Sequence, residues 1–270
     1  MTPGGVRLRE MTQAKLYKAL RKDDVSVRRR TAYNLEEARE AVLDWTGREP
    51  TQEELWHSLR DKTIPYNIRA FLWKAMHSAY MVGDYWRGIP GFEQRVDCQL
   101  CGEEDSLRHI LTSCRASGQS TIWAEVKRIW RHKKLPWREI SLGAVLGCSL
   151  LNITTPSGRA LRGPSRLLKI LVSESAHLAW KIRWEWTMEH NGDPQKILSE
   201  SEVRRRWERA INARLLLDML QTNRTKYDHR AISPQLVEAT WWDVLLDDDW
   251  IITKSGVLVG TGRRPPGRNR

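Results

Sequence analysis

The spacing of apolar residues along the chain predicts helices almost throughout. From residue 165 to about residue 191 apolar side chains recur every three or four positions, the period of a helix with one buried face. The members of this stripe are Leu167, Leu171, Leu178, Ile182 and Trp186. Only the stretch IITKSGVLVG near the carboxyl end is typical of β-strand, and it could form a hairpin. We therefore expect a mainly α fold, a helical bundle with at most a short C-terminal hairpin.

Polar residues that favour helix starts precede several of these apolar stripes. In a capping box, a Ser, Thr or Asn side chain accepts from the third helical N–H while a Glu reaches back to the capping residue. Proline suits the first helical position, because its missing N–H would have no partner there. The predicted boxes are Asn34 with Glu37, Thr51 with Glu54, and Ser199 with Glu202, and the prolines are Pro65 and Pro234.

Composition along the chain predicts its domain organisation. Gly, Ser, Thr and Pro are concentrated between residues 143 and 164, which favours a linker or loop there. The expected parts are a basic, partly disordered segment (1–33), a helical region (34–142) with a small cysteine-rich element (96–114), the linker or loop (143–164), a second helical region (165–262) and a basic tail (263–270).

The cysteine-rich element, VDCQLCGEEDSLRHILTSC, has the spacing Cys-x2-Cys-x7-His-x4-Cys. Zinc prefers four thiolate or imidazole ligands in a tetrahedron, and a tight Cys-x2-Cys turn presents two of them together. The candidate ligands are Cys98, Cys101, His109 and Cys114. Gly102 allows the chain to turn away after the second cysteine, and Asp105–Ser106 can cap a short helix that carries the histidine. Four protein ligands leave no open position, so a structural Zn²⁺ site is predicted.

Three alternatives to zinc stay open at this point. Cys98 and Cys114 could form a disulfide, His109 could be a helix residue without a ligand role, or another metal could bind. The amino-terminal residues contain no apolar signal-peptide region, which favours an intracellular, reducing compartment and hence metal over disulfide. No run approaches the ~18 apolar residues of a membrane span, so no membrane partner is expected.

Charge favours an anionic partner, nucleic acid first. Lys and Arg number 45 against 33 acidic residues, a net charge of +12. The residues predicted to contact phosphate flank the candidate ligands or lie on the helix that follows them: Arg95, Arg108, Lys127, Arg128, Arg131, Lys133 and Lys134. Lys127, Arg131 and Lys134 recur at helical spacing opposite the apolar stripe of that helix. An ordinary solvated helix face is the alternative interpretation.

No catalytic constellation is evident in the sequence. Asp247, Asp248 and Asp249 form the one dense acidic cluster, and a solvated helix end explains them better than a metal site. Ser173 and Ser175 near His177 lack the orienting acid and oxyanion hole that a nucleophile needs. The 14 tryptophans are interpreted as helix-packing core, since each offers a large apolar area and one N–H donor.

The cysteine-rich element, together with the preceding IPYNIRAFLWKAMHSAYMVGDYWRGIPG, resembles the zinc-binding region of non-LTR (LINE-type) retrotransposon reverse transcriptases. LREMTQAKLYKAL, WERAINARLLLDMLQTNRTKY and GVLVG resemble the C-terminal part of fungal elements of this kind. The resemblance implies that Cys98, Cys101, His109 and Cys114 are the metal ligands. In the family, a polymerase and often an RNase H domain lie upstream. The sequence does not suggest either domain here. It has no Asp-Asp pair in a strand–turn–strand setting, as a polymerase needs, and no carboxylates on alternating strands, as RNase H needs.

The expected function is therefore that of a zinc-binding, nucleic-acid-associated and non-catalytic module, a remnant of a retroelement polyprotein. Two alternatives stay open: a protein-interaction or scaffold module that docks other domains of the polyprotein, and an inactive fragment of a reverse transcriptase or RNase H enzyme. An intracellular, nuclear location is expected.

Overall fold

Helices make up most of the computed structural model, which describes residues 12–14, 28–244, 250–252 and 258–260. In chain order, the elements are α2 (Arg29–Thr46), α3 (Gln52–Ser58), α4 (Tyr66–Met76), η3 (Gly83–Trp86), η4 (Glu93–Arg95), α5 (Leu107–Thr112), α6 (Gln119–Arg131), α7 (Leu142–Leu146), η5 (Cys148–Leu150), α8 (Arg162–Met188), η6 (Pro194–Lys196), α9 (Glu200–Leu220), α10 (Arg224–Tyr227), η7 (Asp228–Arg230), α11 (Pro234–Trp241), β1 (Trp250–Ile252) and β2 (Leu258–Gly260). The prediction of a mainly α fold is confirmed.

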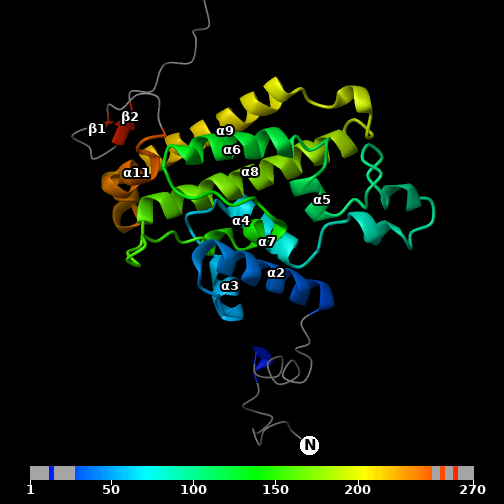
Figure 1. Ribbon diagram of the computed structural model, residues 1–270, viewed down its shortest axis with the longest axis horizontal. Helices are drawn as coiled ribbons and strands as arrows, with labels where there is room; N and C mark the ends of the chain where they lie inside the picture. The colour runs from blue at the N-terminus through cyan, green and yellow to red at the C-terminus, as the bar shows by residue number, and fades with distance from the viewer. Residues whose placement is uncertain (1–11, 15–27, 245–249, 253–257, 261–270) are drawn as a thin grey trace, which may run out of the picture.

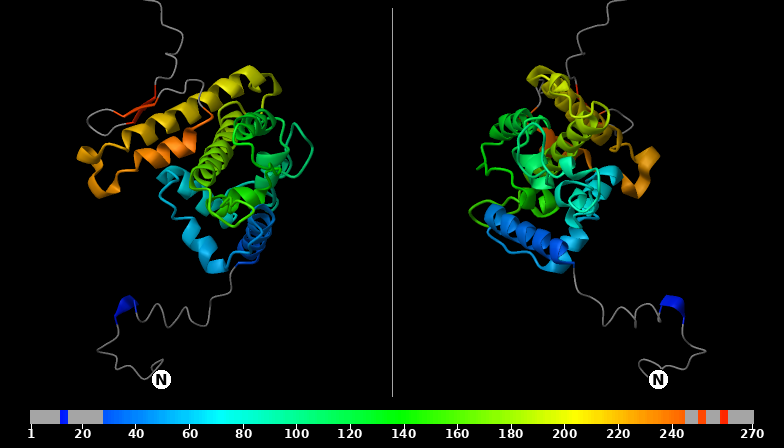
Figure 2. Two further views of the ribbon diagram at one scale, coloured as in Figure 1. Left: turned by 60° about the vertical axis from the view of Figure 1, so that its left-hand side comes forward. Right: turned by 90° about the vertical axis from the view of Figure 1, so that its right-hand side faces the viewer.

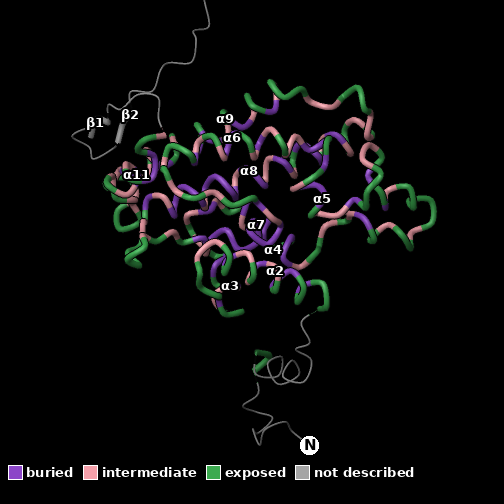
Figure 3. Tube along the Cα trace, viewed as in Figure 1, coloured by how far each residue is buried: buried purple, intermediate pink, exposed green. Residues whose placement is uncertain are grey.

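Helix α8 forms the centre of the bundle (Figure 1), where α4, α5, α6, α7, α9 and α11 all contact it. Leu167, Leu168, Leu171 and Val172 are fully buried, so neighbouring positions and not just one stripe face the core. Figure 3 shows burial concentrated in α8 and in the helices directly beside it. A helix that is covered on more than one side in this way fixes the positions of the elements around it.

The other helices lie on two sides of α8. Helices α6 and α9 lie on one side and contact each other, while α2 and α3 lie on the opposite side beyond α4 and α7 (Figure 1). Figure 2 shows α11 beside α9, where both contact α8. The cysteine-rich element projects at one end of this arrangement, between α4 and α6 in the chain.

Most of the predicted helix starts are confirmed. Thr51 and Glu54 form a full capping box at α3. At α9 only half of the predicted box is observed, because Ser199 accepts from the Glu202 N–H while the Glu202 carboxylate pairs with Arg206. Ser233 caps α11, with Pro234 at the first helical position as expected. These signals succeed because the residues that form each cap are within four positions of one another in the sequence.

The capping box predicted at Asn34 is wrong. Helix α2 already begins at Arg29, and Asn34 lies buried inside it. The Asn34 side-chain amide donates to the Ala75 and Met76 carbonyls at 3.1 and 3.0 Å. These carbonyls end α4 and would otherwise lack intrahelical partners. Asn34 therefore satisfies the carboxyl end of a neighbouring helix, a role that local spacing cannot reveal.

The predicted loop at 143–164 begins with a buried helix, α7, in place of irregular chain. Gly143 in α7 lies against α2 so closely that a Cβ added to it would stand 2.1 Å from the Glu37 carbonyl oxygen. The glycine that suggested a loop therefore permits a close contact between two helices. Whether the regions 34–142 and 165–262 are separate domains stays a prediction.

The predicted C-terminal hairpin is present as two short antiparallel strands, with Trp250 of β1 opposite Gly260 of β2. Residues 253–257 between them lie outside the described residues, as do the basic tail (263–270), the Asp247–Asp249 cluster and most of the basic segment 1–33. In the described part of the chain, no helix has both the length and the apolar character that crossing a membrane requires.

Tryptophans contribute much of the core, as predicted. Trp130, Trp186, Trp207 and Trp241 are buried. Each of these four indole N–H groups has an acceptor: the Pro136 carbonyl, the Asp193 carbonyl, the Ser175 hydroxyl and the Asp218 carboxylate, respectively. The Ser175 hydroxyl therefore supports packing between α8 and α9. Among the described residues, Trp73, Trp184 and Trp242 are instead exposed, with exposed fractions of 46, 49 and 44%.

Glu174 makes the stability of the core dependent on pH. Burial within α8 raises the pKa of this carboxyl to about 7. The folded state therefore holds the proton more tightly than the unfolded state, where an ordinary pKa near 4.5 applies. The stabilisation is fully present below about pH 4.5 and is lost as the pH rises through about 7.

We expect Glu174→Gln to remove this loss. The gain in unfolding free energy over the wild-type protein should be under about 1 kcal/mol at pH 5 and about 3 kcal/mol at pH 8. Urea denaturation at both pH values measures it, with Glu189→Gln, an exposed glutamate just after α8, as the control. A gain of equal size at both pH values would contradict this account.

Candidate metal centre

A tight backbone turn brings the first two cysteines to one place. The Cys98 N–H donates to the Glu103 carbonyl at 2.7 Å, while the Cys98 carbonyl accepts from Cys101 and Gly102 at 3.1 and 2.8 Å. Gly102 has a φ of 73°, which lies in the left-handed region that glycine adopts without strain. The turn therefore closes in the way that the Cys-x2-Cys-Gly sequence predicts.

Helix α5 supplies the other two candidate ligands. Ser106 caps this helix by accepting from the His109 N–H at 3.1 Å, which confirms the predicted cap. The Cys114 N–H donates to the His109 carbonyl at 2.8 Å just beyond the helix end. The helix and its terminal turn thus hold the imidazole and the last thiol on the same side, facing the Cys98–Cys101 turn.

The four candidate side chains form one cluster, in which a ligand atom from each lies within 4.8 Å of all the others. The Cys98 and Cys114 sulfurs are 3.9 Å apart. Sulfurs bound to one tetrahedral zinc at ~2.3 Å would be separated by about 3.8 Å. A disulfide needs ~2.05 Å, so the alternative of a Cys98–Cys114 bridge does not fit this structure, in which both are free thiols.

The histidine is oriented as a ligand would be. His109 is buried, and its Nε2 has no hydrogen-bond partner among the described residues. Its other ring nitrogen, Nδ1, lies 2.9 Å from both a Glu103 carboxylate oxygen and the Ser113 hydroxyl. Metal-bound histidines usually hold their second nitrogen in this way, which fixes the ring and its tautomer. A buried nitrogen without a partner, in a histidine clustered with three thiols, fits a bound cation.

Additional donors surround the sulfurs. The Arg115 N–H points at the Cys101 sulfur at 3.5 Å, and the Arg183 guanidinium lies 3.8 Å from the Cys98 sulfur. The hydrogen bond between Cys98 and Cys114 lowers the pKa of the Cys98 thiol to about 3. The same bond, together with burial, raises the pKa of the Cys114 thiol. The surroundings therefore favour negative charge on at least one sulfur, as a metal-binding thiolate requires.

Arg183 also ties the cysteine-rich element to the central helix. It lies buried in α8, donates to the Asp105 carboxylate at 2.9 Å, and stacks over the Trp186 ring at 4.7 Å from its centroid. Trp186 itself packs in a small buried cluster with Cys98, Cys114 and Ala116. The sequence did not indicate Arg183 or Trp186, because both are about 70 residues or more from the ligands in the chain. An arginine in an otherwise apolar helix stripe is the one available signal.

The structure separates the predicted phosphate contacts into two groups. Those with partners inside the protein are Arg95 over the Trp86 and Phe92 rings, Arg108 with Glu37, Lys127 with Glu139, Arg128 with Glu125, and Lys133 with the Trp242 carbonyl. Arg131 and Lys134 are exposed and form no ion pair with any described residue. Lys133 and Lys134 lie beyond the end of α6, so the prediction that they belong to that helix is wrong. The proposed role of all seven in nucleic-acid binding stays a prediction.

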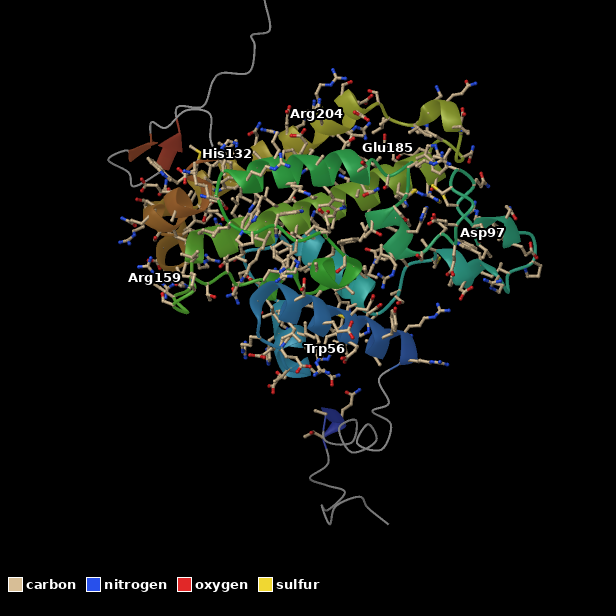
Figure 4. The ribbon with its side chains drawn as sticks, in the orientation of Figure 1. Trp56, Asp97, His132, Arg159, Glu185 and Arg204 are labelled. Carbon is tan, nitrogen blue, oxygen red and sulfur yellow. The ribbon has the colours of Figure 1, made fainter. Side chains whose placement is uncertain are left out.

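The structure also joins two basic clusters that are far apart in the sequence. Glu125 of α6 is buried and accepts from Arg128 at 2.7 Å and from Arg204 of α9 at 2.8 Å. Both guanidinium groups hold the pKa of this carboxyl below its usual value against the opposing effect of burial. The basic end of α9 therefore lies beside α6, and Figure 4 shows Arg204 and His132 along the same edge of the molecule.

Comparison with known proteins identifies the region around these ligands. Residues 29–123 match the model of a family described as zinc-binding in reverse transcriptase. This match runs from the start of α2 into α6 and contains all four candidate ligands. The match agrees with the expected resemblance of this region to the zinc-binding part of reverse transcriptases. No polymerase or RNase H domain is identified in the chain. Neither the curated proteins nor the solved structures provide a match.

Proposed function

We propose that this chain is a zinc-stabilised module that binds nucleic acid through α6 and α9 and has no catalytic activity of its own. Cys98, Cys101, His109 and Cys114 would bind one Zn²⁺. Because four protein ligands complete a tetrahedron, such an ion has no open position for substrate or water and acts structurally. Its role would be to hold the element that carries Asp105 against Arg183 of α8.

The distribution of charge supports α6, and not the metal site itself, as the phosphate contact. The zinc segment (residues 81–114) contains six acidic and three basic residues, a net charge of −3. Residues 115–141, which include α6, contain seven basic and two acidic residues, a net charge of +5. Phosphate groups are therefore attracted to the second stretch far more strongly than to the first. This contrast carries the proposal.

The exposed cations of this region define one surface, which we call the α6–α9 basic surface: Arg128, Arg131, Lys134 and Arg204. Glu125 holds Arg128 and Arg204 together yet carries only one negative charge, so the surface stays positive. Contacts to phosphate position a protein on nucleic acid without reading sequence, so we propose binding that depends on backbone charge. Association with other retroelement domains and a nuclear location stay predictions.

A salt titration tests this proposal. Arg131→Ala with Lys134→Ala removes two exposed charges without breaking an ion pair of the described structure. Each lost phosphate contact should lower the slope of log affinity against log salt by ~0.7 for single strands or ~0.9 for duplex DNA, so the double variant should lose about 1.4 to 1.8. Fluorescence anisotropy with labelled DNA and RNA measures these slopes.

The matched control removes the same charge elsewhere, with Lys62→Ala and Arg159→Ala, two exposed cations away from α6 and α9. An equal fall in slope in both double variants would show that the α6–α9 basic surface is not the contact. If the wild-type protein binds no nucleic acid in a salt-dependent way, the association is wrong and the protein-interaction module becomes the better account.

A further inference from the structure

A cavity of about 220 Å³ lies between the zinc segment and the carboxyl-terminal half of α8. Four tryptophans line it: Trp86 from the zinc segment, and Trp180, Trp184 and Trp186 from α8. The Gln94, Gln99 and Asn191 side chains add amide groups to the wall. Asp97, labelled in Figure 4, marks the side formed by the zinc segment. Aromatic walls with a few polar groups are typical of a ligand site.

The charges around this cavity balance one another, Arg95 and Arg183 against Asp97 and Asp105, and so favour an uncharged occupant. Arg95 already lies over the Trp86 and Phe92 rings, 5.1 Å from each centroid, and Arg183 lies over Trp186 at 4.7 Å. A cation would meet these two guanidinium groups. An anion would meet the Asp97 carboxylate. A neutral, flat group that both donates and accepts hydrogen bonds fits the lining best.

Arg183 provides an independent indication of a missing partner. Although this side chain is only 4% exposed and its Nη2 donates to Asp105, its Nε is buried and has no acceptor among the described residues. Arg183 lines the cavity. Leaving a buried donor of a charged group unpaired costs free energy, so an acceptor that enters the cavity would be stabilised there.

We infer that this cavity binds one unpaired nucleobase of a single-stranded nucleic acid. Bases present a flat ring for stacking on tryptophan or arginine and an edge with both donors and acceptors for amide groups. The volume is below the ~300 Å³ at which drug-sized sites begin, which suits a single ring system. The inference rests on the proposed association with nucleic acid, and gives it a second contact that reads bases and not phosphates.

Trp184 is the residue whose removal tests the cavity. It is 49% exposed, so Trp184→Ala should leave the core folded. Stacking of one base contributes enough that this variant should bind a single-stranded DNA of about 12 nucleotides roughly tenfold more weakly. The slope of log affinity against log salt should not change, because stacking releases no counterions. Trp184→Phe retains an aromatic ring and should recover most of the affinity.

Two controls separate stacking from other effects. Trp73→Ala removes a tryptophan of similar exposure, 46%, on α4, which is outside the cavity lining. It should leave affinity unchanged. A strand of the same length with abasic sites throughout keeps the phosphates and loses the bases. It should bind the wild-type protein and Trp184→Ala equally.

Each outcome decides the inference. A roughly tenfold loss for Trp184→Ala that disappears on the abasic strand supports the nucleobase site. An unchanged affinity, or an equal loss in Trp73→Ala, overturns it while salt-dependent binding remains, which leaves the cavity to some other occupant such as an aromatic side chain of a partner protein. Absence of salt-dependent binding in the wild-type protein would instead overturn the proposed function itself, so the two failures are distinguishable.

Discussion

Cys114→Ala is expected to abolish metal binding and to release the zinc segment while the helical core stays folded. The buried cluster around the ligands is small: Cys98, Cys114, Ala116 and Trp186. Two of its four members are thiols that would bind the ion. Structural zinc sites contribute on the order of 10 kcal/mol to folding of small modules, far more than this cluster can supply through apolar burial.

The effect should therefore be local and large. Native mass spectrometry should find one zinc in the wild-type protein and none in Cys114→Ala. Hydrogen exchange should show protection in residues 96–117 falling by several orders of magnitude, because the opening free energy of this part drops by several kcal/mol. Helices α8 and α9, whose core does not include the ligands, should keep their protection.

Cys148→Ala is the matched control, because Cys148 is fully buried in the helical core and away from the cluster. It should keep one zinc and the protection of residues 96–117. If Cys114→Ala proves insoluble, treatment of the wild-type protein with a chelator gives the same comparison without a variant. Unchanged exchange after the metal is lost would refute the structural role of the site.

The sequence alone predicted that Cys98, Cys101, His109 and Cys114 come together, because the geometry that groups them is local. All four ligands lie within residues 98–114, and the Gly102 turn and the Ser106 cap that orient them are in the same stretch. Such short-range geometry follows from spacing and turn chemistry. The contacts that attach the cluster to the protein, from Arg183 and Trp186 of α8, could not be predicted, because no local rule connects positions so far apart.

The same distinction explains the errors in the predicted fold. The apolar period predicted α8 correctly, yet Asn34 was assigned to a helix start because the sequence around it matches a capping box. Its actual partners, the Ala75 and Met76 carbonyls, belong to another helix. Gly143 likewise indicated a loop, although its missing side chain serves the close contact of α7 with α2. In both cases tertiary contacts decided the role of the residue.

A buried network of charges joins α8, α9 and α11. Asp218 of α9 is fully buried and accepts from both Arg166 terminal nitrogens at 2.6 and 2.8 Å. Arg214 lies 3.0 Å from the same carboxylate, and the Trp241 indole donates to it at 2.9 Å. One buried carboxylate thus balances two buried guanidinium groups and anchors α11.

We expect Asp218→Ala to lower the unfolding free energy by about 3 to 5 kcal/mol, because it leaves two buried cations without their counter-charge. Glu185→Ala is the matched control: Glu185 also joins α8 to α9 through a two-pronged bridge, to Arg206 at 2.6 and 3.1 Å, but both side chains are partly exposed. Solvent screens that pair, so its loss should cost under about 1 kcal/mol.

Urea denaturation compares the two variants, and hydrogen exchange in α11 should rise only in Asp218→Ala. Equal costs would mean that burial adds nothing to this network, and a stable Asp218→Ala protein with protected α11 would show that apolar packing alone holds the three helices together.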